Sequence, residues 1–139
     1  MLLPKKVKFR KWHTMRVNPK KKRVATRGTT VAFGSFGLKA MTPARVKSTQ
    51  IEAARKAMQR NLKKTGRLWI RIFPDMPYTA KPAEVGMGKG KGDPQGYIFQ
   101  VLPGRVLFEI DGVDEALATE TLMKGCSKLP LTAKVVARI

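Results

Sequence analysis

Three serines are the residues of this chain whose type could provide a nucleophile. Ser35, Ser48 and Ser127 would each need a histidine as general base and a carboxylate to orient that histidine. The sequence has a single histidine, His13, and it lies in a strongly basic segment. We therefore reject a serine–histidine–carboxylate arrangement and predict that the chain is not an enzyme.

The carboxylates and the cysteine also do not indicate a catalytic or metal site. Asp111, Asp114 and Glu115 cluster where a helix is expected to begin, and capping and the helix dipole account for them there. Cys126 is the only cysteine, which excludes an intrachain disulfide and a cysteine-rich zinc site. With one histidine in addition, we predict no metal and no cofactor.

A loop rich in glycine and lysine spans residues 86–96 and has some features of a nucleotide-binding loop. A phosphate-binding loop needs a glycine five residues before its Gly-Lys pair, but Ala83 and Val85 occupy these places. Neither Lys89 nor Lys91 is followed by serine or threonine. Two positive charges on a backbone with little bulk favour contact with the phosphates of RNA or tRNA. The alternative is a plain flexible loop.

The charge of the chain indicates a polyanionic partner. The 139 residues include 29 Lys and Arg against 9 Asp and Glu, a net charge of +20. Such a body repels itself unless a polyanion supplies counter-charge. Residues 1–71 hold 21 of the basic residues and one acid, Glu52, whereas residues 105–139 hold 5 of each. This polarity favours a nucleic-acid-binding side, with an anionic membrane surface as the second candidate.

Residues 1–28 are predicted to be a basic RNA-binding extension that becomes ordered on its partner. They show no sustained helical period and bury little apolar surface. Phe9 and Trp12 alternate with cations, which suits stacking on unpaired bases. A solvated tail or a sorting signal is the alternative. The predicted rRNA-binding residues of the extension are Lys5, Lys6, Lys8, Arg10, Lys11, Trp12, His13, Arg16, Lys20, Lys21, Lys22, Arg23 and Arg27.

The remaining residues, 29–139, are predicted to form a single α+β domain. Short turns between strands favour two layers, with a mixed or mostly antiparallel sheet and two helices packed on it. The prolines between 74 and 82 predict an extended connection, and Pro103-Gly104 predicts a turn. Strands are expected at 31–38 (interrupted by a glycine turn), 68–73, 97–102, 105–110 and 131–138, and the second helix at 113–128.

The first helix has the clearest pattern. Thr49 and Glu52 fit a capping box, and Gly66 is the expected stop. Apolar residues at helical spacing predict a buried stripe of Ile51, Ala54, Met58 and Leu62. Cations on the other faces and in the next strand complete the predicted rRNA-binding set: Arg55, Lys56, Arg60, Lys63, Lys64 and Arg71.

Five ordered strings carry a resemblance to a known family. They are FGSFGL at 33–38, QIEAAR at 50–55, WIRIFPD at 69–75, MGKGKG at 87–92 and PGRVLFE at 103–109. Together they resemble the bacterial form of the universal L-sixteen family of large-subunit ribosomal proteins, whose archaeal and eukaryotic relatives are called L-ten-e. A nucleoid-type DNA-binding protein and a free RNA chaperone are competing interpretations, but neither explains the five strings.

The resemblance implies a small α/β domain of hammerhead type that binds large-subunit rRNA near the central protuberance and the peptidyl-transferase region. It implies late assembly, neighbouring ribosomal proteins as partners and contact with A-site tRNA, with P-site tRNA as a second candidate. It also implies a cytoplasmic ribosome of bacterial type, with an organellar ribosome as the alternative, and neither a membrane nor a homo-oligomer. The loop residues implied to face tRNA are Met87, Gly88, Lys89, Gly90, Lys91 and Gly92.

Two positions depart from the family's pattern. Members commonly have arginine just before the Met-Gly-Lys-Gly-Lys-Gly string, and Gly86 stands there in this chain. A contact or modification that depends on that arginine is therefore in doubt. The segment 16–27 is also longer and more basic than usual in the family.

Overall fold

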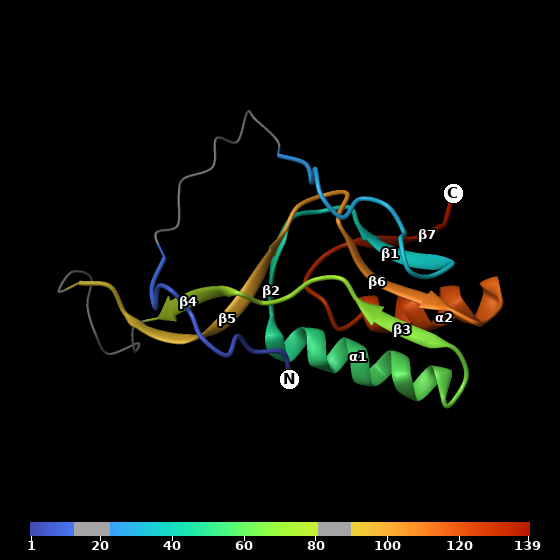
Figure 1. The fold of residues 1–139 in the computed structure, drawn as a ribbon, viewed down its shortest axis with the longest axis horizontal. Helices are drawn as coiled ribbons and strands as arrows, with labels where there is room; N and C mark the ends of the chain where they lie inside the picture. The colour runs from blue at the N-terminus through green and yellow to red at the C-terminus, as the bar shows by residue number, and fades with distance from the viewer. Residues whose placement is uncertain (13–22, 81–89) are drawn as a thin grey trace.

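The computed structural model describes residues 1–12, 23–80 and 90–139. Within these ranges two helices accompany strands in two antiparallel sheets, which confirms the predicted α+β class (Figure 1). The elements are β1 Phe36–Ala40, β2 Ala44–Lys47, α1 Ser48–Leu62, β3 Arg67–Ile70, β4 Met76–Ala80, β5 Asp93–Val101, β6 Val106–Asp111, α2 Glu115–Cys126 and β7 Ala133–Ala137.

The larger sheet has four strands in the order β3-β6-β1-β7. Leu38 of β1 pairs with Phe108 of β6, and both belong to the core that α1 and α2 cover. Every residue of β6 from Val106 to Ile110 is buried. Strand β6 is therefore covered on both faces, by the helices on one side and by residues 31–35 on the other.

The smaller sheet has the order β2-β5-β4 and forms an arm that projects away from the helices (Figure 1). Strand β4 lies where only an extended connection is predicted, because Pro77 within it and Pro74 and Pro82 on either side argue against a strand. Pro77 pairs with Tyr97 at the sheet edge, where a residue without an N–H is tolerated. Strand β2 was also missed, since four residues are too short for a clear alternation.

Helix α1 buries the predicted stripe, but both of its ends differ from the prediction. The capping box at Thr49 and Glu52 is wrong, because the helix begins at Ser48 and the Lys47 N–H donates to Gln50 Oε1 at 2.8 Å. Glu52 instead accepts from the Arg55 guanidinium, which lowers the pKa of the carboxyl.

The stop of α1 also lies earlier than predicted. The helix ends at Leu62, and Lys63 takes the positive φ of 58° that a glycine usually adopts. Gly66, with a φ of 72°, shapes the turn that follows into β3. The sequence pattern therefore located the reversal of the chain but not the residue that ends the helix.

Helix α2 is capped as its carboxylates predict. Asp114 accepts the Leu117 N–H at 2.9 Å through its side chain, and Glu115 lies in the first turn. Near its end Gly125 faces α1 so closely that a Cβ there would stand 2.6 Å from the Met58 sulfur. A glycine at this point lets the two helices approach each other.

The alternation predicted around β3 is confirmed, but the strand ends at Ile70 and not at Phe73 as predicted. Leu68 and Ile70 pack against the core, while Trp69 and Arg71 face the other side of the sheet. The strand predicted for 31–38 is wrong in its first half. Residues 31–35 form an irregular loop over the outer face, and β1 begins only at Phe36.

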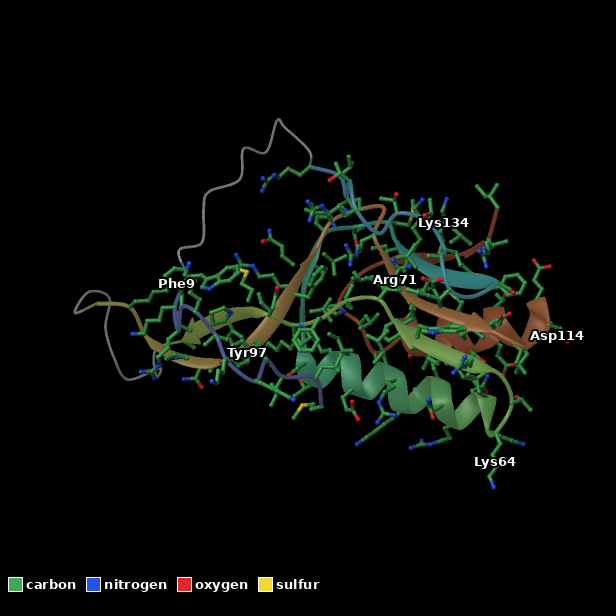
Figure 2. All side chains as sticks on the ribbon, viewed as in Figure 1. Phe9, Lys64, Arg71, Tyr97, Asp114 and Lys134 are labelled. Carbon is green, nitrogen blue, oxygen red and sulfur yellow. The ribbon has the colours of Figure 1, made fainter. Side chains whose placement is uncertain are left out.

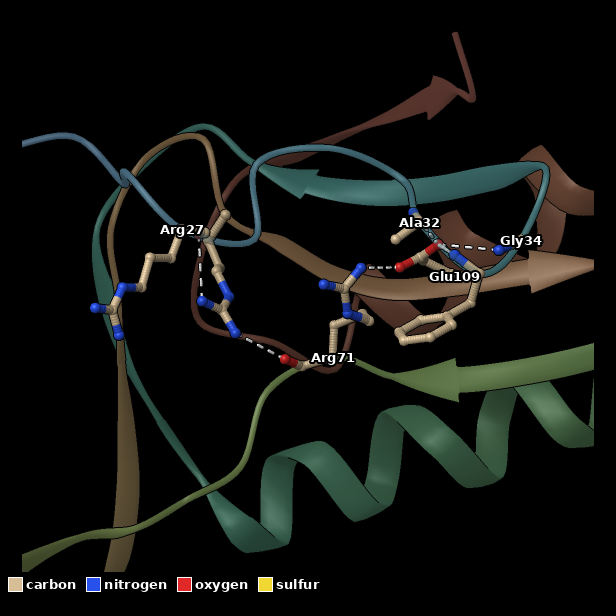
Figure 3. A network of polar contacts seen from close by, with 7 residues as sticks. Arg27, Ala32, Gly34, Arg71 and Glu109 are labelled. Atoms are coloured by element: carbon tan, nitrogen blue, oxygen red, sulfur yellow. Dashed lines mark hydrogen bonds and ion pairs between the residues drawn. The ribbon is translucent and has the colours of Figure 1, made fainter.

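The buried carboxylate of Glu109 holds this loop in place (Figure 3). Its side chain is 0% exposed, and Oε1 accepts the N–H groups of Ala32, Phe33 and Gly34 at 2.8, 2.8 and 3.0 Å. Oε2 forms an ion pair with Arg71. Burial alone would raise the pKa of Glu109, but the Gly34 N–H, the Arg71 guanidinium and the Phe33 N–H together lower it.

We predict that Glu109→Gln lowers the free energy of unfolding by about 1–3 kcal/mol, because a charged acceptor for several donors is lost. A carboxyl with a lowered folded pKa stabilises the protein above its unfolded pKa and loses this effect as the pH falls through the folded value. The difference between parent and variant should therefore shrink at acid pH. Urea unfolding at neutral and acid pH measures both effects.

Glu120→Gln is the matched control, because Glu120 is 58% exposed and pairs with Lys124 at 3.2 Å on the surface of α2. This change should alter the free energy of unfolding by less than about 0.5 kcal/mol. Equal losses in the two variants would show that the buried network around Glu109 contributes nothing specific.

Candidate RNA-binding interface

Residues 1–12 lie against the domain and present their cations to solvent. Leu2 packs against the core, and the Met1 ammonium lies 3.9 Å from Glu52 Oε2 at the start of α1. The chain then follows the arm of β4 and β5, where a shallow groove of about 180 Å³ includes Phe9 and Asp75. Five predicted RNA-binding cations of this segment are exposed: Lys5, Lys6, Lys8, Arg10 and Lys11.

The end of this segment meets the described end of the glycine- and lysine-rich loop. Lys11 Nζ donates to the Lys91 carbonyl at 3.3 Å, and Lys91 Nζ donates to the Trp12 carbonyl. The Trp12 side chain is 40% exposed. The structure thus brings together a segment predicted to bind rRNA and a loop predicted to face tRNA.

Residues 23–28 lie along the turn between β5 and β6. The Ala25 N–H donates to the Pro103 carbonyl at 2.9 Å, and the Val106 N–H donates to the Gly28 carbonyl at 2.7 Å. Arg23 and Arg27, both predicted RNA-binding residues, keep exposed side chains. Residues 23–28 are therefore anchored to the turn between β5 and β6 through their backbone, which leaves the side chains of Arg23 and Arg27 in solvent.

Arg105 reinforces this anchor and was not predicted as a site residue. Its guanidinium donates to the carbonyls of Arg27 and Arg71 at 3.3 and 2.9 Å (dashed lines in Figure 3). The guanidinium also lies 5.2 Å from the centre of the Phe99 ring. Burial, with a smaller contribution from the charge of Arg71, lowers the pKa of Arg105. In the sequence, Arg105 is a single arginine after Pro103-Gly104, with no pattern that predicts its contacts. The fold shows that it connects residue 27 to residue 71.

Helix α1 presents the third group of predicted residues. Lys56, Arg60, Lys63 and Lys64 are exposed, whereas Arg55 is partly engaged by Glu52. Figure 2 shows Phe9 beside the arm and Lys64 at the opposite end of α1, so the predicted residues are spread along the molecule.

The groove between the two helices adds cations from the second half of the chain. It measures about 350 Å³ and is lined by Arg60, Asn61, Lys124 and Lys128 among others. Lys124 Nζ donates to Asn61 Oδ1 at 2.8 Å. Because the charges of residues 105–139 balance along the sequence, they do not predict this contribution. Lys124 and Lys128 come to lie beside Arg60 of α1 only when the chain folds.

Arg71 differs from the other predicted RNA-binding residues. Its side chain is 18% exposed, pairs with Glu109 and lies over the Phe33 ring, with Cζ 4.9 Å from the ring centre. These contacts give Arg71 a structural role, and we do not include it among the proposed phosphate contacts.

Strand β2 contributes two exposed cations that the sequence analysis missed. Arg45 and Lys47 alternate with Ala44 and the buried Val46, and Lys47 Nζ lies 5.5 Å from the centre of the Tyr78 ring. The two-residue alternation was the available signal. It extends over only four residues, too few to predict a strand.

Several predicted site residues lie outside the described ranges. They are His13, Arg16, Lys20, Lys21, Lys22, Met87, Gly88 and Lys89, and Gly86 lies there as well. The described serines have ordinary structural contacts: the Ser35 hydroxyl donates to Asp111 Oδ1 at 2.6 Å, and Ser127 donates to the Lys124 carbonyl. The Ser35 hydroxyl and the Gly112 N–H lower the pKa of Asp111.

In residues 1–12, 23–80 and 90–139, neither helix combines the length and apolar character needed to cross a bilayer. Within the same ranges, histidine, cysteine and carboxylate side chains do not gather in threes at a distance that would hold a metal ion. What the surface offers instead is exposed cations in several regions, and this arrangement suits the phosphates of an extended polyanion.

Comparison with known proteins identifies the family of the chain. The family described as "Ribosomal protein L16p/L10e" matches residues 4–136. Proteins named "Large ribosomal subunit protein uL16" from Rhodopseudomonas palustris and Nitrobacter winogradskyi are each 55% identical over 139 residues, and the protein of that name from Afipia carboxidovorans is 53% identical. Each alignment covers 100% of this chain and 98% of the relative.

These matches extend over almost the whole sequence, well beyond the five strings that first carried the resemblance. They confirm the prediction of a ribosomal protein rather than an enzyme. The chain belongs to the ribosomal protein L16p/L10e family.

Proposed function

We propose that this protein is a structural constituent of the large ribosomal subunit and binds large-subunit rRNA near the central protuberance and the peptidyl-transferase region. It joins late in assembly and contacts A-site tRNA, with P-site tRNA as a second candidate. Its other partners are neighbouring ribosomal proteins of a bacterial-type, cytoplasmic ribosome. The family match and the name shared by the relatives support this proposal.

One observation carries the RNA-binding part of the proposal. Residues 1–71 hold 21 basic residues and a single acid. Most of the described cations in this stretch are exposed, and Glu52 is occupied by Arg55 and the N-terminal ammonium. Phosphate contacts need positive charge that acidic neighbours do not neutralise. Such contacts fix the position of the protein on the RNA and do not read its base sequence.

The spread of the cations favours a folded RNA over a small anion. Exposed cations lie on residues 1–12, on residues 23–28 and along α1, and they come from different sides of the domain (Figure 1). A single small anion could meet only one of these regions. A large RNA can contact all of them at once and so provide counter-charge for the whole surface.

Comparison of two nucleic acids tests the proposal against a DNA-binding function. We expect the protein to bind fragments of large-subunit rRNA more tightly than duplex DNA at matched salt, and to sediment with large subunits in a cell extract. Equal affinity for both nucleic acids, together with no protein in the large-subunit fractions, would contradict the proposal.

Binding should depend steeply on salt. With on the order of 6–10 phosphates neutralised, we expect affinity for rRNA to fall about a thousandfold or more between roughly 50 and 200 mM salt. Replacing Lys56, Arg60 and Lys64 with glutamine should make the slope of log affinity against log salt shallower by roughly 0.7–0.9 for each lost phosphate contact. A slope unchanged in this triple variant would remove α1 from the interface.

Loop lysines provide the test of the tRNA contact. Replacing Lys89 and Lys91 with alanine should change the free energy of unfolding by no more than about 0.5 kcal/mol per site, as at exposed positions, although Lys91 also loses its contact with the Trp12 carbonyl. Ribosomes reconstituted with the variant should accommodate A-site tRNA more slowly or assemble less completely.

Lys134→Ala is the control for this experiment. Lys134 is an exposed lysine of β7, and Figure 2 shows it at the other end of the molecule from the arm. Thermal melting and translation rates of both variants separate stability from function. If the double variant melts far below the parent, or if its ribosomes translate as well as the control, the loop has a structural role only.

A further inference from the structure

The outer face of the four-stranded sheet carries an aromatic pair that the functions proposed above do not use. The rings of Phe33 and Trp69 stack with centroids 6.2 Å apart and an angle of 22° between their planes. Phe33 is 55% exposed, and Trp69 is half-buried. Large rings are usually buried, so a phenylalanine left this open offers apolar surface to a partner.

Two arginines border this pair. Arg71 Cζ lies 4.9 Å from the centre of the Phe33 ring, and Arg67 Cζ lies 5.7 Å from the centre of the Trp69 ring. The Arg71 charge is balanced by Glu109, whereas Arg67 is exposed at the edge strand β3. Asp111 pairs with Arg67 in the ladder, but its carboxylate accepts from Ser35 and Gly112.

The position of Phe33 is fixed rather than incidental. The N–H groups of Ala32, Phe33 and Gly34 all bind the buried Glu109 carboxylate. Gly34 lies so close to β6 that a Cβ there would stand 2.5 Å from the Ile110 carbonyl oxygen. The backbone that carries the exposed Phe33 ring is therefore held in place before any ligand binds.

We propose that Phe33 and Trp69 form a stacking platform for one unpaired RNA base, with Arg67 placed to meet the phosphate next to that base. This rests on the proposal that the protein binds RNA and names a contact of a different kind from phosphate binding. Flat apolar rings beside a free cation match a nucleotide, which has a flat base and a charged phosphate. An apolar protein partner would leave the charge of Arg67 without an acceptor.

Tryptophan fluorescence can report on the platform directly. The chain has two tryptophans, so Trp12→Phe leaves Trp69 as the only one. Single-stranded RNA should quench Trp69 emission in this variant, whereas an abasic oligonucleotide of the same length and charge should bind with little quenching. Fluorescence anisotropy of a dye on each oligonucleotide measures binding independently of the tryptophan signal.

Phe33→Leu in the same background should abolish most of the quenching and weaken binding of the base-bearing strand by roughly five- to a hundredfold, the range seen when one stacked base is lost. Its affinity for the abasic strand should not change. Phe73→Leu, at a ring that is 43% exposed, is the matched control and should alter neither signal. Circular dichroism melts establish that each variant folds.

The outcomes separate the two proposals. If both strands bind and quench Trp69 equally, or if Phe33→Leu weakens both equally, the platform is wrong and RNA binding through phosphates stands. If an apolar peptide quenches Trp69 and the base-bearing strand does not, the face is a protein contact and the platform is again wrong. If neither strand binds, RNA binding itself fails and the platform fails with it.

Discussion

A carboxylate without access to water is the constraint on which the outer half of this domain depends. Glu109 lies in an inner strand of the larger sheet with its side chain 0% exposed, and an uncompensated charge there would be very costly. Compensation comes from donors distant in sequence: three successive N–H groups beginning at Ala32, and the Arg71 guanidinium. The N–H groups that bind Glu109 Oε1 hold the loop of residues 31–35 across the sheet. The ion pair with Oε2 fixes Arg71, the residue that follows β3.

Arg105 extends the same network toward residues 23–28. By donating to the Arg27 and Arg71 carbonyls, it joins this segment and the end of β3 to the turn between β5 and β6. Two half-buried arginines thus hold the structure together, while most of the other described arginines and lysines are exposed. The sign of a charge therefore says little about its role in this protein. Burial and partners distinguish the cations that hold the fold together from those that we propose to contact RNA.

Structural features that depend on residues close together in the sequence could be predicted. Features that depend on contacts between distant residues could not. The stripe from Ile51 to Leu62 and the alternation around Trp69 depend on neighbours within one element, and both are confirmed. The Pro103-Gly104 turn has the positive φ, 99° at Gly104, that its residue types favour. The sequence wrongly predicts a strand at 31–35, because the binding of this loop to Glu109 spans more than 70 residues and leaves no periodic pattern. For the same reason the sequence does not distinguish Arg71 from the exposed cations, because its partner Glu109 is also distant along the chain.

The proline in β4 also affects whether two copies of the protein can associate through the edges of their sheets. An open strand edge can template the addition of a strand from another molecule, which is the first step toward aggregation. Pro77 lies in the edge strand β4 and has no N–H to offer to an added strand. The opposite edge, β2, carries Arg45 and Lys47, whose charges repel a second copy. The projecting arm is thus protected on both sides against edge-to-edge association while the protein awaits its partner.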